Sequence, residues 1–346
     1  MRLIVTGGAG FIGSALVRHA VGQNHDVLTI DKLTYAGRRE SIEEVMASPR
    51  HQFLQADIAD AAAMNSAFSD FDPDAILHLA AESHVDRSID EPGIFVRTNV
   101  HGTVVLLEAA LRQLSRLSGQ RRERFRFVHV STDEVFGSLG ASGAFSRESR
   151  YAPNSPYAAS KAASDHFARA YHETYKLPVV VTNCTNNYGP WQHSEKFIPT
   201  VVRHALEYAP IPIYGSGTNV RDWLHVDDHV RGLMAATEQG QPGEAYLFGG
   251  RNEEANNDVA KRICSILDTM RPRSDEKSYA EQMVTVADRP GHDFRYAIDP
   301  SYAEGALAWR SATSFQNGLA ATIDWYLRNE QHLLPPNSLG RLGNRQ

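Results

Sequence analysis

The first twenty residues constrain the fold more than any other stretch of the chain. The segment RLIVTGGAGFIGSALVRHA, residues 2–20, has the pattern of a short apolar strand, a glycine-rich turn and a helix. Gly8, Gly10 and Gly13 have the GxGxxG spacing, which permits a tight turn, close approach of the backbone to a pyrophosphate and packing of helix on strand. The helix N-terminus would offer its N–H groups to that anion. The segment therefore predicts a dinucleotide-binding βαβ unit.

Short apolar runs alternate with helical patterns along the first half of the chain. Strands are expected at 2–6, 26–31, 52–56, 75–80, 125–131 and 178–183. Residues 99–114 and 155–175 have the patterns of long helices, and the second begins with Ser-Pro, which suits a helix N-terminus. This alternation predicts an α/β fold of the Rossmann type, a doubly wound parallel sheet with helices on both faces.

The regular alternation fades after residue 183, where Pro and Gly punctuate the chain. We expect a smaller, mixed α/β lobe that closes over the carboxyl ends of the strands, where open α/β sheets bind ligands. The expected division assigns 1–185 and 219–246 to the dinucleotide-binding domain. It assigns 186–218 and 247–330 to the second lobe, and 331–346 to an irregular tail.

Composition narrows the classes of function and location. The 41 acidic and 35 basic side chains give a formal charge of −6, which argues against general nucleic-acid binding. No apolar run approaches the ~20 residues of a membrane span, and no signal segment begins the chain, so a cytoplasmic protein is expected. Cys184 and Cys264 are expected to be reduced, buried thiols. The histidines lack metal-site spacing, and no metal is expected.

Two aspartates end the second and third predicted strands. Asp31 follows the glycine turn by about twenty residues, where a carboxylate accepts both ribose hydroxyls of an adenosine and would repel a 2′-phosphate. This favours NAD over NADP, although Lys32, Arg38 and Arg39 lie close by in the sequence. Asp57 could bind the adenine amine or could start a helix, and its position leaves both interpretations open.

The run Ser131-Thr132-Asp133-Glu134 places two carboxylates where a buried strand should end. Ser-x-x-Glu also matches a helix capping box, in which Ser131 and Glu134 only bond to the backbone. Because successive residues of a strand point to opposite faces, Asp133 and Glu134 can serve one pocket only if the strand ends near Ser131. Two such close carboxyls would drive their pKa values apart, so that one holds a proton near neutral pH.

Tyr157 and Lys161 are four residues apart in a predicted helix and therefore share a face. An ammonium beside a phenol stabilises the phenolate and lowers its pKa, which makes a base usable near neutral pH. The same spacing also occurs in ordinary surface helices. Its position after a dinucleotide fingerprint favours the catalytic interpretation.

Several stretches together resemble the extended short-chain dehydrogenases, and among them the NAD-dependent 4,6-dehydratases of dTDP-glucose. The resemblance covers residues 1–326 and rests on VTGGAGFIG, HLAAESHVDRSI, HVSTDEVFG, SPYAASKAASDH, NCTNNYGPWQHSEKFIP and RPGHDFRYAIDP, among others. The Asp-Glu pair is the discriminating feature, because the related sugar epimerases lack it. Phe136 and His225 stand where this family usually has tyrosine, and these changes concern the shape of the pocket more than the chemistry.

The resemblance implies a role for each catalytic residue. Tyr157 would take the proton of the sugar 4-hydroxyl, assisted by Lys161 and Thr132, while C4 gives its hydride to NAD. Glu134 would remove the C5 proton, and protonated Asp133 would donate to the departing 6-hydroxyl. The hydride would return to C6, giving dTDP-4-keto-6-deoxyglucose for deoxysugar synthesis, for example of rhamnose.

The resemblance also implies two sets of binding residues. For NAD they are Gly7, Gly8, Gly10, Phe11, Ile12, Gly13, Asp31, Lys32, Leu33, Thr34, Asp57, Ile58, Leu79, Ala80, Ala81, Ser83, Thr98, Tyr157, Lys161 and Asn187. For the sugar nucleotide they are Ser83, Thr132, Asn186, Lys196, Phe197, Pro212, Ile213, Tyr214, Arg221, Asn256, Arg289, His292 and Asp293. Arg221 and Arg289 suit a diphosphate, because a guanidinium can pair two oxygens at once.

Other functions remain open at the level of sequence. A nucleotide-sugar 4-epimerase would use Tyr157 and Lys161 but would have no task for Asp133 and Glu134. A dehydratase of another nucleotide sugar, or a noncatalytic NAD sensor, would keep the same fold. The family resemblance further implies a homodimer formed through the two long helices, with neither nucleic acid nor membrane as a partner.

Overall fold

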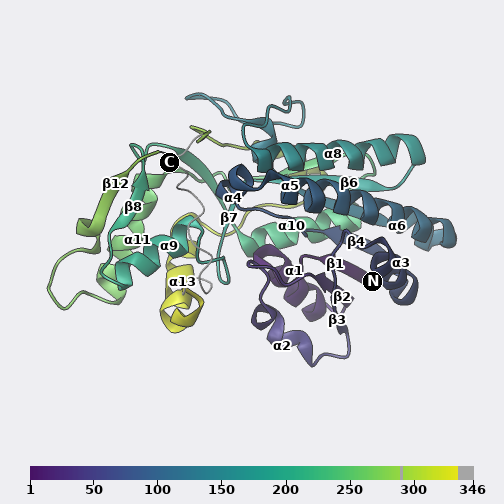
Figure 1. Ribbon diagram of the computed structural model, residues 1–346, viewed down its shortest axis with the longest axis horizontal. Helices are drawn as coiled ribbons and strands as arrows, with labels where there is room; N and C mark the ends of the chain where they lie inside the picture. The colour runs from purple at the N-terminus through teal and green to yellow at the C-terminus, as the bar shows by residue number, and fades with distance from the viewer. Residues whose placement is uncertain (289–290, 334–346) are drawn as a thin grey trace.

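The computed structural model describes residues 1–288 and 291–333, and a seven-stranded parallel sheet forms the centre of that part of the chain (Figure 1). Its strand order is β10-β6-β5-β4-β1-β2-β3. The strands are β1 (Arg2–Thr6), β2 (Asp26–Asp31), β3 (His51–Gln55), β4 (Ala75–His78), β5 (Arg126–Thr132), β6 (Val179–Cys184) and β10 (Ala245–Phe248). The predicted fold class is confirmed, and the six expected strands are present with ends shifted by at most two residues.

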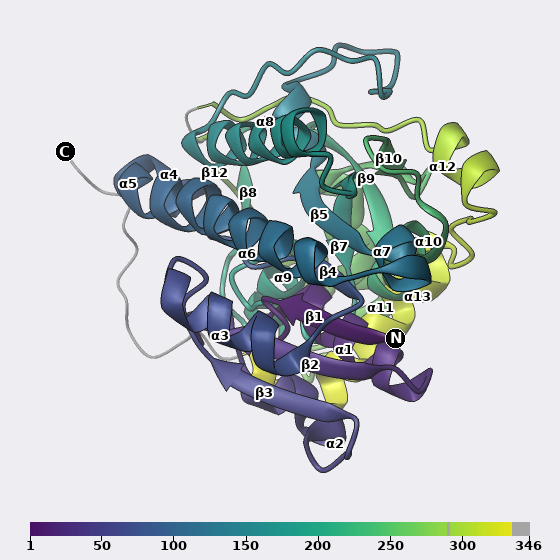
Figure 2. The same ribbon diagram turned by 90° about the vertical axis from the view of Figure 1, so that its right-hand side faces the viewer.

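Helices cover both faces of the sheet, as Figure 2 shows from the side. One face packs against α1 (Phe11–Gly22) and α10 (Val226–Gln239). The other packs against α3 (Ala61–Phe71), α6 (Thr103–Arg116) and α8 (Pro156–Tyr175). The chain order reverses between β1 and β4, and this switch point opens a crevice at the carboxyl edge, where ligands of such sheets bind.

The second half of the chain adds two small sheets. The first has the order β11-β9-β7, and the second pairs β12 with β8. Their strands are β7 (Asn186–Tyr188), β8 (Ile211–Tyr214), β9 (Val220–His225), β11 (Glu253–Ala255) and β12 (Met283–Val286). They share a separate apolar core with α9 (Phe197–Leu206), α11 (Asn256–Met270) and α13 (Phe315–Arg328). These elements lie beside the carboxyl edge of the large sheet, at the left of Figure 1.

Short elements complete the described chain. They are α2 (Glu43–Met46), α4 (Val85–Asp90), α5 (Pro92–Phe95), α7 (Gly119–Arg124), α12 (Ser301–Ala306), a π turn at Val96–Gly102 and 3₁₀ turns at Arg39–Ile42, Asp133–Phe136, Tyr279–Gln282 and Glu330–Leu333. The domain division drawn from the sequence stays a prediction. Of the expected tail, 331–333 belong to the last 3₁₀ turn, and 334–346 lie outside the described residues.

The helical segment Pro92–Arg116 has the length and apolar composition of a membrane span, although the sequence contains no uninterrupted apolar run of that length. Half of its most apolar stretch is buried within the protein. Leu106, Leu107 and Ala110 are fully buried against the sheet and α3. The segment therefore has the packing of a core helix. Cys184 and Cys264 are both buried and unpaired, which confirms their expected state.

Candidate active site

The glycine turn between β1 and α1 leaves room for a ligand's phosphates close to the backbone. Gly7 has φ +70°, and a Cβ there would lie 2.7 Å from the Ala80 backbone nitrogen. A Cβ on Gly13 would lie 2.1 Å from the Gly7 carbonyl oxygen. Gly10 is the N-cap of α1, so the first N–H groups of this helix have no side chain over them. Phe11 and Ile12 form the first turn. This cradle fits a dinucleotide pyrophosphate.

Asp31, at the end of β2, is fixed by two backbone groups. Its Oδ2 accepts from the Ala9 N–H at 2.9 Å, and its Oδ1 accepts from the Leu33 N–H at 2.8 Å. Burial raises the pKa of Asp31, and these two hydrogen bonds oppose that rise. Each oxygen keeps a lone pair for a ribose hydroxyl. Neighbouring Lys32 is turned away to an ion pair with Asp57 at 2.8 Å.

The carboxylate of Asp57 is held by several nearby hydrogen-bond and ion-pair partners. Besides Lys32, its Oδ1 accepts from the Ala59 N–H at 2.9 Å, and Arg97 lies 3.4 Å from its Oδ2. The helix-start interpretation of Asp57 is wrong, because Asp60 caps α3. The remaining residues predicted for NAD lie after β4 and on nearby turns: Leu79, Ala80, Ala81 and Ser83, with Thr34, Ile58, Thr98 and Asn187. Asn187 is held by its own neighbours, since its Oδ1 contacts His229 Nδ1 at 2.9 Å.

The Ser-Thr-Asp-Glu run ends β5 and begins a 3₁₀ turn, so the strand stops at Thr132, one residue after the predicted position. Thr132 is the N-cap, and its Oγ1 accepts from the Glu134 N–H at 3.2 Å. The alternative interpretation of Ser131 as the cap is therefore wrong. The Ser131 hydroxyl donates instead to Asp165 Oδ2 at 2.8 Å, a hydrogen bond to a charged acceptor.

Asp133 has the properties of a buried acid. Its side chain is 2% exposed, and burial together with the charge of Glu134 raises its pKa to about 8. Its Oδ1 accepts from Thr132 Oγ1 at 3.3 Å. Its Oδ2 has no hydrogen-bond partner among residues 1–288 and 291–333. This raised pKa favours the protonated form of Asp133 near neutral pH.

Tyr157 and Lys161 lie in the first turns of α8, and both are buried against the end of β5. Lys161 Nζ donates to the Val130 carbonyl at 2.8 Å. Burial, followed by the charge of Glu134, raises the pKa of Tyr157 well above its ordinary value, while the Thr132 hydroxyl acts to lower it. The predicted lowering of this pKa by Lys161 is therefore wrong for the protein alone. The ammonium donates to a backbone carbonyl, and the charges of Glu134 and Asp133 add to the rise in the Tyr157 pKa.

A buried carboxylate that the sequence analysis missed joins these two elements. Asp165, one turn after Lys161, accepts from Tyr151 OH at 2.8 Å and Ser131 Oγ at 2.8 Å, and it contacts His129 Nε2 at 3.0 Å. Burial acts to raise the pKa of Asp165, but these partners and the Lys161 charge outweigh it, so the pKa is lowered. The i to i+4 spacing from Lys161 was the available signal.

The smaller sheets bring basic and aromatic groups to the same edge. Arg221, on β9, is nearly buried, donates to the Asp293 carbonyl at 3.0 Å and lies 4.4 Å above the ring of Tyr296. The Tyr296 hydroxyl donates to the Asp293 carboxylate, and the charge of Glu134 contributes to a strongly raised pKa of Tyr296. Tyr296 is a second residue that the sequence analysis missed. It lies in the segment RPGHDFRYAIDP, three residues after the expected Asp293.

The other predicted substrate residues are distributed around this edge. Asn186 has a buried Oδ1 without a partner among the described residues. Lys196 Nζ donates to the Ser83 carbonyl at 3.1 Å, and Phe197 stacks on Trp223. His292 Nδ1 contacts Asp288 at 2.6 Å. Pro212, Ile213 and Tyr214 belong to β8, and Asn256 begins α11. Arg289 lies outside the described residues.

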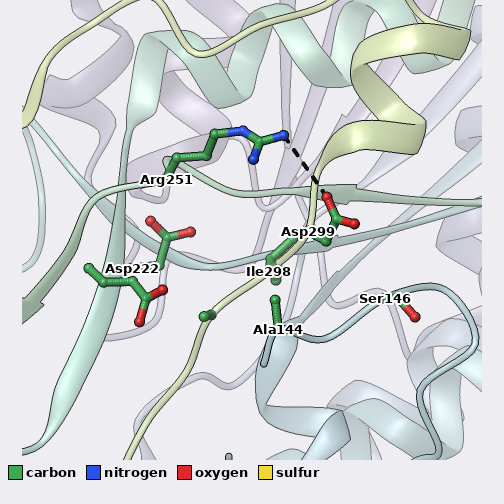
Figure 3. A pocket seen from close by; sticks show the side chains of 8 residues that line it. Ala144, Ser146, Asp222, Arg251, Ile298 and Asp299 are labelled. Atoms are coloured by element: carbon green, nitrogen blue, oxygen red, sulfur yellow. Dashed lines mark ion pairs between the residues drawn. The ribbon is translucent and has the colours of Figure 1, made fainter. Parts of the chain in front are cut away.

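A separate cavity of about 730 Å³ is lined in part by Asp222 of β9 and Glu253 of β11 (Figure 3). Asp222 and Arg251 are among its lining residues, and Arg251 is 4.0 Å from Asp299. Asp222 accepts from the Gly250 and Asn252 N–H groups, and burial raises its pKa to about 6. None of the predicted site residues lines this cavity.

Comparisons with known proteins agree on one group of enzymes. The profile of the family described as GDP-mannose 4,6 dehydratase matches residues 4–322. A probable dTDP-glucose 4,6-dehydratase of Sinorhizobium fredii is 54% identical, over 95% of this chain and 93% of its own. The crystal structure of a dTDP-glucose 4,6-dehydratase from Streptomyces venezuelae, with NAD bound, is 44% identical with a TM-score of 0.87, and covers 96% of this chain and 98% of its own.

The fold alone does not separate two chemistries. A UDP-glucose 4-epimerase from Thermotoga maritima is 26% identical, covers 95% of this chain and all of its own, and gives a TM-score of 0.84. Both reactions would place a buried tyrosine and lysine beside a dinucleotide. An elimination requires an acid as well as a base, and Asp133, which directly precedes Glu134 and acts on the pKa of Tyr157, is a buried carboxyl with a raised pKa.

Proposed function

The chain belongs to the sugar-nucleotide 4,6-dehydratase family, and we propose that the pocket at the ends of β5 and α8 carries out its reaction. The protein is an NAD-dependent hydro-lyase that converts dTDP-glucose into dTDP-4-keto-6-deoxyglucose, a deoxysugar precursor. The observation that carries the assignment of the pocket is the neighbouring pair of a protonated Asp133 and Glu134 beside Tyr157. An epimerase would have no use for that pair.

The glycine cradle and Asp31 hold NAD, because together they supply room for the pyrophosphate, helix N–H groups and an acceptor for the ribose hydroxyls. When bound, NAD accepts the hydride of C4, returns it to C6, and brings a positive ring close to the catalytic tyrosine. Lys161 is placed to donate to the nicotinamide ribose from the Val130 side of the pocket. The NAD-binding domain comprises 1–185 and 219–246, and 186–218 and 247–330 bind the sugar nucleotide.

Tyr157 is the base for oxidation. Its phenolate takes the proton of the 4-hydroxyl as the C4 hydride leaves. In the protein alone burial and carboxylates oppose phenolate formation, and the Thr132 hydroxyl stabilises it. Lys161, itself buried, adds positive charge in the same region, and Asp165 opposes the lowering of the Lys161 pKa that burial causes.

Glu134 and Asp133 carry the elimination. The 4-ketone acidifies the C5 proton, which Glu134 removes, and Asp133 donates its proton to the leaving 6-hydroxyl. These two positions are one carbon apart on the sugar, and adjacent carboxyls reach both. A pKa of about 8 favours the protonated form of Asp133 at neutral pH. Asp133 Oδ2 is the donor, since its Oδ1 is bonded to Thr132.

The sugar nucleotide occupies the space between the large sheet and the smaller sheets. Arg221 binds the diphosphate, and the buried Asn186 amide contacts the sugar nucleotide nearby. The residues of β8 and the start of α11 recognise the nucleoside. Tyr296 extends this wall toward Glu134.

The enzyme forms a homodimer through α6 and α8 and works in the cytoplasm. The support for the dimer is a set of exposed apolar side chains: Ile89 on α4, Ile94 on α5, Val96 in the π turn that follows α5, and Phe167 on α8. Such a set on one face of a soluble fold marks an interface. Two unpaired thiols agree with a reducing compartment.

Mass spectrometry of purified protein tests this function. The protein is incubated separately with dTDP-glucose and UDP-glucose, with and without added NAD, and the sugar nucleotide is examined for loss of one water. We expect loss from dTDP-glucose. No loss from either substrate in the presence of NAD would contradict the dehydratase assignment, and loss from UDP-glucose alone would reassign the nucleoside.

A further inference from the structure

The protons of the proposed reaction do not balance within the active site after one turnover. Tyr157 gains the proton of the 4-hydroxyl, and Asp133 gives its own proton to the departing hydroxyl to form water. Glu134 takes the C5 proton and returns it when the hydride reaches C6, so Glu134 ends as it began. Each cycle therefore leaves one proton too many on Tyr157 and one too few on Asp133. This reasoning rests on the proposed function.

Thr132 lies between these two residues. Its Oγ1 is 3.3 Å from Asp133 Oδ1, and its hydroxyl acts to lower the pKa of the Tyr157 phenol, as a donor to the phenolate does. The Glu134 N–H donates to the same oxygen at 3.2 Å, which fixes the hydroxyl at the strand end. All three side chains are buried, with exposures of 8% for Thr132, 2% for Asp133 and 9% for Tyr157. The three side chains therefore have little contact with bulk water.

We propose that the Thr132 hydroxyl returns the proton from Tyr157 to Asp133 at the end of each turnover. The Tyr157 O–H bond breaks as a new O–H bond forms on Thr132 Oγ1. The original Thr132 O–H bond breaks as an O–H bond forms on Asp133 Oδ1. Negative charge moves from the carboxylate to the phenolate, and no other reactant is consumed. The phenolate then accepts a hydrogen bond from Thr132, which is the state needed to begin oxidation.

Two further features fit this path. Rotation of the carboxyl about its Cβ–Cγ bond moves the new proton to the position of Oδ2, which has no partner among the described residues and is therefore available to the next substrate. The transfer runs toward Asp133 once the hydride has reached the sugar, because positive charge beside the phenol is then restored. The pKa of Asp133, about 8, keeps the returned proton in place at neutral pH.

Thr132→Val and Thr132→Ser test the relay, because valine removes the hydroxyl at similar volume and serine retains it. Each variant is measured in two reactions. One is steady-state turnover of dTDP-glucose. The other is single-turnover oxidation of dTDP-6-deoxyglucose by bound NAD. This sugar has no 6-hydroxyl, so its oxidation does not use the acid Asp133. Circular dichroism and NAD binding establish that each variant is folded.

We expect Thr132→Val to slow both reactions, because the phenolate loses a hydrogen bond, and to slow turnover by a further factor of about 10 or more. Formic or acetic acid should partly restore turnover by Thr132→Val and leave Thr132→Ser unchanged. Equal losses in the two reactions, including complete loss of both, would overturn the relay and leave Thr132 a role in oxidation alone. If the wild-type protein does not dehydrate dTDP-glucose, the proposed function fails instead.

Discussion

Replacement of the buried acid by its neutral amide should make the protein more stable while it loses activity. Asp133 has a pKa of about 8 in the folded protein against an ordinary value of 3.8. Between those values the unfolded chain ionises this carboxyl and the folded protein holds it protonated. Folding stability at this site is therefore fully present below pH 3.8 and is lost as the pH rises toward 8. Asp133→Asn removes that dependence.

The size of the effect follows from the same two values. Each unit of pKa difference corresponds to about 1.4 kcal/mol, so at pH 7 ionisation favours the unfolded wild type by about 4 kcal/mol. The amide oxygen of asparagine can keep the bond from Thr132, and its nitrogen takes the place of Oδ2, which in the described structure has no partner to lose. The advantage of Asp133→Asn over wild type should grow by about 1.4 kcal/mol per pH unit between pH 5 and pH 7.

Urea unfolding followed by circular dichroism at several pH values, with NAD held constant, measures this difference. Asp165→Asn is the matched control, because Asp165 is equally buried but its partners lower its pKa. That variant should be less stable than wild type at neutral pH. The reasoning is refuted if Asp133→Asn is less stable than wild type at pH 7, or if its advantage does not change with pH.

Three further outcomes are expected. Asp133→Asn should still transfer hydride to NAD but dehydrate the sugar at least about 100-fold more slowly. The absorbance of the reduced nicotinamide should then show that reduced cofactor accumulates. Turnover at the wild-type rate would contradict the role of Asp133 as the acid. Tyr157→Phe should lower oxidation by about 10² to 10⁴, and normal formation of reduced cofactor in a single turnover would exclude it as the base. Gly13→Ala should abolish NAD binding in calorimetry, because its Cβ would lie 2.1 Å from the Gly7 oxygen, whereas Gly22→Ala, with open space around it, should bind normally.

The large sheet could be predicted from the sequence because its strands are buried on both faces and appear as short apolar runs. The glycine turn before α1 and the position of Asp31 at the end of β2 were also predictable, since both depend on local spacing. The residue that caps the 3₁₀ turn after β5 could not be predicted from the sequence. Ser131 and Thr132 can both cap the following turn, and the choice was made by Asp165, which lies 34 residues further along the chain.

Electrostatic properties of the site required the three-dimensional arrangement. The sequence shows Lys161 one turn from Tyr157, but it does not show that Lys161 donates to the Val130 carbonyl or that the charge of Glu134 raises the pKa of the phenol. Likewise, it shows two adjacent carboxyls but not which of them is buried. Tyr296 comes from a distant part of the chain and reaches the site only through the fold.

The proposed chemical residues all lie in one continuous stretch, 132–161, carried by the end of β5, the 3₁₀ turn after it and α8. Most of the proposed sugar-nucleotide contacts come from a later stretch, 186–293. Mutations that change recognition can therefore accumulate in one part of the gene without altering the reaction. A lineage of such enzymes can acquire new sugar-nucleotide substrates while the catalytic step is inherited unchanged. Recombination between relatives at the end of β6 would exchange preference and chemistry as separate units.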